Sequence, residues 1–148
     1  MYQHILIPTD GSKTAAKAVD AGIDYAREAG AKVLFFTAVP EFQVPHESEV
    51  LARHRVKSVF EYEEETAAKA RAILDKATAV AKDANIEFDT AFAFCNRPYE
   101  AIIAAAKKHR CDAIFMASHG RSGIPALWYG SQTHEVLTHS DIPTLVYR

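Results

Sequence analysis

Two clusters that contain glycine have the composition of a phosphate-binding site. The first is Ala117-Ser118-His119-Gly120-Arg121-Ser122-Gly123, and the second is Gly130-Ser131-Gln132-Thr133. Glycine lets the backbone approach a ligand closely, and successive N–H groups in such turns form a concave site for anions. The second cluster also opens a predicted helix, whose free N–H groups and positive dipole end favour phosphate. An ordinary glycine loop before a capped helix would have the same spacing, so the spacing alone leaves both interpretations open.

Several side chains in these clusters could add to the backbone donors. The hydroxyls of Ser131 and Thr133 can donate to phosphate oxygens, and Arg121 adds positive charge. His119 is the histidine placed nearest to the proposed ligand. We interpret it as a residue that stabilises the loop, with direct contact to the ligand as the alternative.

A third polar group follows the first apolar run of the chain. Pro8-Thr9-Asp10-Gly11-Ser12 places an acid and two hydroxyls directly before a predicted helix. The carboxylate of Asp10 could accept hydrogen bonds from a base or a ribose. Capping of the following helix is the more ordinary role of Asp and Ser at such a turn, so this pentapeptide by itself favours capping.

The motifs of several enzyme classes are missing. No G-x-x-x-x-G-K-[ST], G-x-G-x-x-G or G-x-S-x-G occurs, which argues against a P-loop NTPase, a dinucleotide dehydrogenase and an α/β-hydrolase. The signatures S-G-G-x-D-S and H-x-G-H of adenylyl-transferring enzymes are also absent. The seven histidines form no H-x-x-x-H motif and no Cys/His cluster with metal-ligand spacing. We therefore expect no catalytic residues, no protein metal site and at most slow turnover.

Alternating strands and helices must position these groups. Apolar runs predict strands at 4–8, 32–39, 87–94, 112–117 and 144–147. Ser12 and Gly30 bound the first predicted helix, Pro98 opens another, and a last one spans about 131–139. Helical periodicity also covers about 48–84, a length that predicts a break or an ill-ordered first part. The glutamates at 61 and 63–65 within it are interpreted as a solvated face.

This alternation predicts a mostly parallel sheet with helices on both faces. The 87–94 run alternates in polarity and is expected near a sheet edge. In such a sheet, ligands bind beyond the carboxyl ends of the strands, where the strand order reverses. Cys95 and Cys111 would lie at opposite ends of neighbouring elements, so we expect no disulfide between them.

The bulk composition is that of one globular domain, residues 1–148. Apolar residues make up 49% and charged residues 24%, with a net charge of −2 and a pI of about 6.4. Neither nucleic acid nor an anionic membrane is favoured by that charge. No apolar run approaches the roughly 20 residues of a membrane span. Residues 1–4 lead into a strand without an export signal, so we expect a cytoplasmic protein.

Taken together, these blocks make the chain resemble the universal stress protein family over its whole length. The family's nucleotide-binding pattern, G-x2-G-x9-G-[ST], falls on Ala117, Gly120, Gly130 and Ser131. The segment 5–12 resembles the family's first-strand signature, and 136–146 resembles its last helix and strand. The resemblance implies an α/β, Rossmann-like fold of the adenine-nucleotide alpha-hydrolase type, with an open five-stranded sheet of order 3-2-1-4-5.

The resemblance also implies ATP, with or without Mg²⁺ or Mn²⁺, across the ends of the first and fourth strands. Asp10 would meet the adenine, with Pro8, Thr9 and the backbone at Ala38 beside it, and Met116 and Ala117 would border base and ribose. The phosphates would be lined by Gly120, Arg121, Gly130, Ser131, Gln132 and Thr133. The family's first glycine is Ala117 here. This methyl group is tolerated if the residue is extended, as the end of a strand would be.

We therefore expect an ATP-holding regulatory or stress-response protein with little or no turnover. The alternative is a nucleotide-free member of the family that acts as a protein-interaction module. Residues 144–147 would form a short apolar edge strand, which predicts a homodimer joined through the C-terminal strand.

Overall fold

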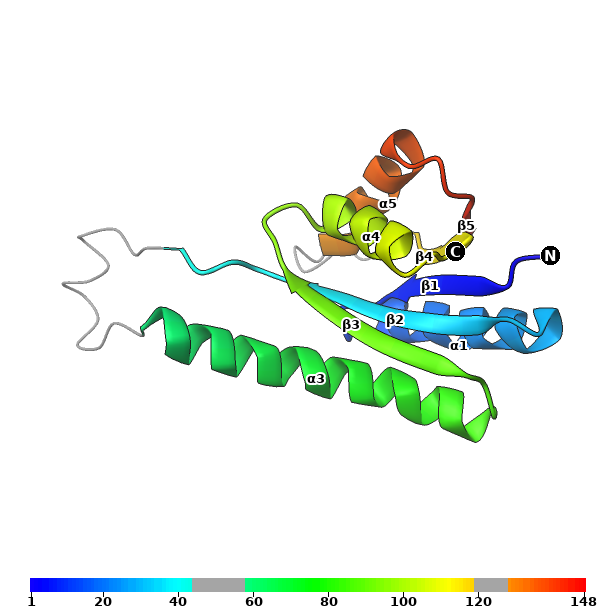
Figure 1. The fold of residues 1–148 in the computed structure, drawn as a ribbon, viewed down its shortest axis with the longest axis horizontal. Helices are drawn as coiled ribbons and strands as arrows, with labels where there is room; N and C mark the ends of the chain where they lie inside the picture. Colours follow the sequence, from blue (N-terminus) through cyan, green and yellow to red (C-terminus); the bar gives the residue numbers. More distant parts are fainter. Residues whose placement is uncertain (44–57, 119–127) are drawn as a thin grey trace.

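The computed structural model describes residues 1–43, 58–118 and 128–148. Strands and helices alternate along these residues and build one sheet with helices packed on it (Figure 1). The strands are β1 (His4–Pro8), β2 (Lys32–Val39), β3 (Phe88–Phe94), β4 (Ala113–Ala117) and β5 (Thr144–Tyr147). The helices are α1 (Lys13–Ala29), α3 (Val59–Asp83), α4 (Pro98–Lys108) and α5 (Trp128–His139).

The sheet has the order β3-β2-β1-β4-β5, and each of its four pairings is parallel. This confirms the predicted fold class and strand order. Ile5 at the centre of the sheet pairs with Val33 on one side and with Ala113 on the other. The strand order reverses between β1 and β4. From β1 outward, β2 and then β3 lie on one side of the sheet, and β4 and then β5 lie on the other.

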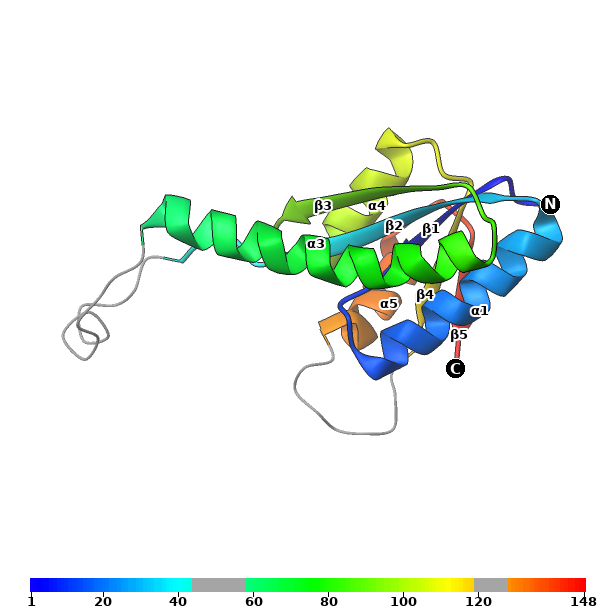
Figure 2. The same ribbon diagram turned by 90° about the horizontal axis from the view of Figure 1, so that it is seen from below.

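Both faces of the sheet are covered because strand side chains alternate between them. Ile5 and Ile7 pack with Phe35 against α1 and α3. Leu6 and Phe36 point to the opposite face, which α4 and α5 cover. Figure 2 shows α1 and α3 lying together across one face. These two clusters form the main apolar core. Full burial of each side chain of this size contributes about 1.5–3 kcal/mol to the stability of the fold.

Helix α1 agrees closely with the sequence pattern. Its buried residues recur at helical spacing and are Ala15, Ala18, Val19, Gly22, Ile23 and Ala26. The side chain of Ser12 caps its amino end, and Gly30 ends it with φ 65°. Gly22 lets this helix approach the sheet, since a Cβ there would lie 2.6 Å from Cδ1 of Ile7. The predicted N-cap and helix exit are therefore confirmed.

Other boundaries differ from the predictions by one to a few residues. Strands β3 and β4 each begin one residue later than predicted, and α5 begins at Trp128 rather than at Ser131. The predicted helix over about 48–84 is observed as α3 from Val59, with Ser58 as its N-cap. Its expected first part falls largely on residues 44–57, which lie outside the described residues. Glu63, Glu64 and Glu65 are exposed, in agreement with a solvated face, whereas Glu61 is half-buried.

Cys95 and Cys111 are free thiols, as the placement of their strands predicted. Among the described residues, no helix is both long and apolar enough to cross a membrane.

Candidate functional site

The carboxyl ends of β1 and β4 lie side by side at one edge of the sheet. Pro8 ends β1, Ala117 ends β4, and the two strands are direct neighbours. Helices α4 and α5 begin on this same side of the molecule (Figure 1). The topology therefore brings the polar turn after β1 and the first turn of α5 to the same edge, although about 120 residues of sequence separate them.

The turn after β1 is ordered by its own side chains. The Thr9 N–H donates to the Phe36 carbonyl at 2.9 Å, which ties the turn to β2. Asp10 Oδ1 accepts the Ser12 N–H at 2.9 Å, and Ser12 Oγ accepts the Ala15 N–H at 3.1 Å. Ser12 is thus the helix cap, whereas Asp10 shapes the turn before it. A carboxylate has about four acceptor positions, so this one bond leaves half-buried Asp10 with capacity for a ligand.

Gly11 is required in this turn for two reasons. Its φ of +79° belongs to the left-handed region, which side chains with a Cβ rarely adopt. A Cβ at this position would also lie 3.1 Å from Cγ1 of Ile73 on α3. The turn that carries Asp10 is therefore packed directly against α3.

The first turn of α5 carries the second half of the predicted site. Gly130 and Ser131 lie within the helix, and Ser131 is exposed. Gln132 Oε1 accepts the backbone N–H of Tyr99 at 2.9 Å. Thr133 is 5% exposed, and its Oγ1 donates to the Ala117 carbonyl at 2.8 Å. These two side chains, which were predicted to line the phosphates, thus already contact α4 and β4.

The remaining predicted residues fall into two groups. Ala38 and Met116 are almost fully buried, and Met116 packs in the core with Leu6 and Phe36. Each can offer its backbone to a ligand, while its side chain belongs to the core. Ala117 is half-buried, ends β4 and is not among the non-glycine residues with positive φ. The predicted residues His119, Gly120 and Arg121 lie outside the described residues.

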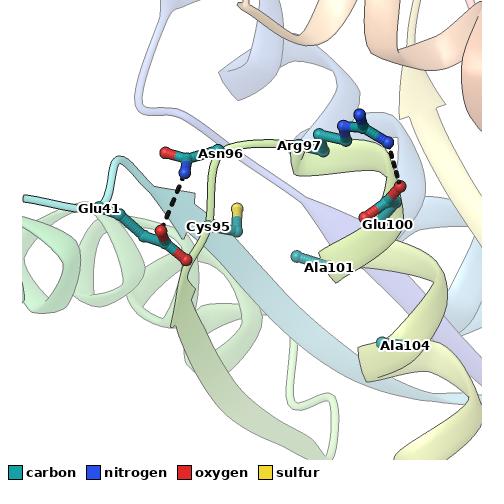
Figure 3. Close-up of a pocket in the computed structure, with 7 residues that line it drawn as sticks. All are labelled: Glu41, Cys95, Asn96, Arg97, Glu100, Ala101 and Ala104. Atoms are coloured by element: carbon teal, nitrogen blue, oxygen red, sulfur yellow. Dashed lines mark hydrogen bonds and ion pairs between the residues drawn. The ribbon is translucent and has the colours of Figure 1, made fainter. Parts of the chain in front are cut away.

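A cavity of about 420 Å³ lies at the carboxyl ends of β2 and β3, and none of its lining residues is among the predicted ones (Figure 3). Asn96 Nδ2 donates to Glu41 Oε2 at 2.9 Å on one side, and Arg97 pairs with Glu100 at 3.1 Å on the other. Burial, and then the nearby Glu41 carboxylate, raise the pKa of the Cys95 thiol. A protonated thiol is a poor nucleophile. The sequence marked this place only through Cys95, a cysteine at a strand end.

Within residues 1–43, 58–118 and 128–148, no group of three or more His, Cys, Asp or Glu side chains could hold a metal ion.

Comparison with known proteins gives one consistent family. A model of the universal stress protein family matches residues 1–148. A curated relative from Thermus aquaticus, the universal stress protein in QAH/OAS sulfhydrylase 3'region, is 29% identical over 151 residues, and the alignment covers 100% of both chains.

Solved structures agree with this match. A universal stress protein in complex with cAMP is 25% identical with a TM-score of 0.70, covering 99% of this chain and 97% of that one. The universal stress protein from Archaeoglobus fulgidus in complex with dAMP shares the fold at 16% identity, with a TM-score of 0.65 and coverage of 99% and 98%.

Proposed function

Because the chain belongs to the universal stress protein family, we propose that it binds ATP at the carboxyl ends of β1 and β4 and acts as a nucleotide-holding regulatory protein. The observation that carries this proposal is the placement of two complementary groups at one edge. A carboxylate with spare acceptor capacity, Asp10, lies on one side. The amino end of α5, with Gly130 and exposed Ser131 in its first turn, lies on the other.

Each group suits a different part of an adenine nucleotide. The Asp10 carboxylate can accept a hydrogen bond from the exocyclic amine of adenine or from a ribose hydroxyl. In this proposal the backbone of Thr9 and Ala38 also borders the base. The first N–H groups of α5 and the Ser131 hydroxyl can donate to phosphate oxygens. Two family structures, one in complex with cAMP and one in complex with dAMP, support an adenine nucleotide as the ligand class.

The residue that departs from the family's glycine pattern does not weaken the proposal. Ala117 is the last residue of β4, and its φ is not positive. Its methyl group therefore carries none of the strain that a left-handed alanine would have. The backbone can follow the strand to its end with alanine as well as with glycine.

We expect slow turnover or none. Among the described residues, Asp10 is the carboxylate that lies at the carboxyl ends of β1 and β4. In this proposal Asp10 contacts the base, far from the phosphate bond that hydrolysis would break. Efficient hydrolysis needs a group that orients and activates water at the γ-phosphate. A Mg²⁺ or Mn²⁺ ion would be held by the ATP phosphates themselves, so the proposal needs no protein metal cage.

We also propose that the protein forms a homodimer in which the β5 strands of two copies pair. This strand is one edge of the sheet, and its Val146 and Tyr147 are 38% and 37% exposed. An apolar edge with unpaired backbone groups is stabilised by pairing with another strand. A two-fold axis would pair two copies of β5 antiparallel.

The experiment for ATP binding begins with protein purified without added nucleotide. Acid extraction and chromatography identify any nucleotide carried along, and calorimetric titration of the stripped protein measures its affinity for ATP. Gly130→Val is the matched variant, because its side chain would fill the space that the phosphates need. We expect the folded variant to lose ATP binding. A folded Gly130→Val protein with the parent's affinity would contradict the phosphate assignment, and a parent that binds no nucleotide would favour the nucleotide-free alternative.

A further inference from the structure

The amino end of α4 needs an acceptor that its own sequence does not supply. Arg97 occupies the N-cap position and makes no side-chain capping bond, and Pro98 has no N–H. The N–H groups of Glu100 and Ala101 both donate to the Arg97 carbonyl. This leaves the Tyr99 N–H as the first-turn donor that requires an outside partner.

Gln132 on α5 supplies that partner. Its Oε1 lies 2.9 Å from the Tyr99 nitrogen, across 33 positions of sequence. A backbone N–H can only donate, so the Gln132 atom that faces it must be the carbonyl oxygen of the amide. One side chain of α5 therefore completes the helix cap of α4.

The neighbouring residue fixes α5 in a second direction. The buried Thr133 hydroxyl donates to the carbonyl of Ala117, the last residue of β4. Ser131, one position before Gln132, is exposed. Of these three consecutive polar side chains, two point to neighbouring elements and one points to solvent.

We propose that Gln132 and Thr133 are positioning residues that hold the first turn of α5 against α4 and β4, and that neither of them is a phosphate ligand. This assignment rests on the proposed ATP site. It separates two supports from a row of residues that all looked like phosphate ligands. Gln132 keeps its bond to Tyr99 when the nucleotide binds.

Hydrogen exchange of the Tyr99 amide tests the role of Gln132 directly. Gln132→Met keeps the length of the side chain but has no acceptor, whereas Gln132→Glu keeps an acceptor at a helix amino end that favours negative charge. We expect the Tyr99 amide to exchange up to about tenfold faster in Gln132→Met and at nearly the parent rate in Gln132→Glu. In the parent protein, saturating ATP should leave Tyr99 at least as protected as before.

Thr133 offers a second matched pair. Thr133→Ser keeps the hydroxyl, while Thr133→Val keeps the shape and removes it. We expect Thr133→Val to weaken ATP binding by about tenfold and adenosine binding by less than about twofold, because only the phosphate end depends on the placement of α5. Thr133→Ser should bind both ligands like the parent.

Distinct outcomes separate this inference from the proposed function. A parent that binds no ATP would contradict the proposed function, while Tyr99 exchange without ligand would still decide the Gln132–Tyr99 link. Equal exchange in parent and Gln132→Met would overturn the positioning role. Faster Tyr99 exchange in the parent on adding ATP would also overturn it, because Gln132 would then leave Tyr99 for the ligand. If Gln132→Met fails to fold, Gln132→Glu and the parent with and without ATP still give the answer.

Discussion

Asp112 and His4 hold each other at the amino ends of β4 and β1. Asp112 Oδ1 accepts the His4 N–H at 2.9 Å, and the Asp112 N–H donates to the His4 carbonyl at 2.9 Å. The second oxygen, Oδ2, accepts the Gln3 N–H at 2.9 Å. A single side chain thus joins the two central strands at the end of the sheet opposite the proposed site.

Replacement of Asp112 should therefore destabilise the fold without touching the nucleotide site. We expect Asp112→Ala to lower the free energy of unfolding by about 1–2 kcal/mol, because the N–H groups of Gln3 and His4 lose their acceptor. Asp112→Asn keeps one acceptor oxygen and should lose about half as much. Denaturant unfolding measures both values, and ATP affinity should stay unchanged. An Asp112→Ala protein as stable as the parent would show that solvent replaces these bonds without cost.

The imidazole of His4 makes the stability depend on pH. His4 is 7% exposed. Among the described residues, its Nε2 is the buried side-chain nitrogen or oxygen atom that has no hydrogen-bond partner. Burial, and then the charge of Lys32, lower its pKa from 6.5, whereas Asp89, Asp112 and a backbone hydrogen bond with His109 act in the opposite direction. The unfolded chain therefore binds a proton at a pH where the folded protein does not.

The sign of the effect follows from this difference. The stability contribution of neutral His4 is fully present above pH 6.5 and is lost as the pH falls below that value toward the lower folded pKa. We expect His4→Phe to lose less stability than the parent between about pH 7 and about pH 5, as measured by denaturant unfolding. His109→Gln, which keeps the backbone at that position, should behave like the parent. Parallel pH profiles for parent and His4→Phe would rule out His4 as the cause.

The two thiols should differ in reactivity. Burial, and then the nearby Asp112 carboxylate, raise the pKa of Cys111 to about 12, and this residue is 6% exposed. Cys95 is only half-buried, although its pKa is also raised. Since the thiolate is the nucleophile, iodoacetamide at neutral pH should modify Cys95 slowly and Cys111 hardly at all. Mass spectrometry of the intact protein should show one adduct before unfolding and two after it. An early adduct on Cys111 would mean that β4 opens locally.

Pairing through β5 can be tested by changing one backbone donor. Proline removes the N–H and is poorly tolerated in a paired strand, so Val146→Pro should convert a dimer into a monomer. Val146→Thr keeps the N–H and a β-branched side chain and should remain dimeric. Light scattering gives the molecular mass of each, and circular dichroism confirms that each is folded. A monomeric parent at micromolar concentration, or a folded dimer of Val146→Pro, would contradict the proposed interface.

The sequence was informative wherever a structural feature depends on neighbouring residues. The buried face of α1 and its cap at Ser12 follow from helical spacing and from one hydroxyl at the turn, both of which are local. The boundaries of β2 and β5 follow in the same way from apolar runs between breakers. The strand order came from resemblance to a family, because pairing partners such as Val33 and Phe88 are set by tertiary contacts.

The roles of polar side chains were harder to predict. Ser131, Gln132 and Thr133 look equivalent along the chain, and only the packing of α4 and β4 beside them distinguishes their directions. Helix α5 begins three residues earlier than predicted, because Gly130 and Ser131 look like the entry to a helix although the helix already includes both. The reciprocal contact between His4 and Asp112 spans 108 positions and has no local signal.

The central position of β1 has a consequence for how the chain folds during its synthesis. On one side, β1 pairs with β2, which follows soon after it, but on the other side it pairs with β4, which is complete only at residue 117. A growing chain can thus assemble β1, β2 and β3 with α1 and α3 while one edge of β1 still lacks its partner. A nucleotide held between Asp10 and α5 would bind only after the late strands arrive. It would then stabilise the completed sheet over the shorter intermediate.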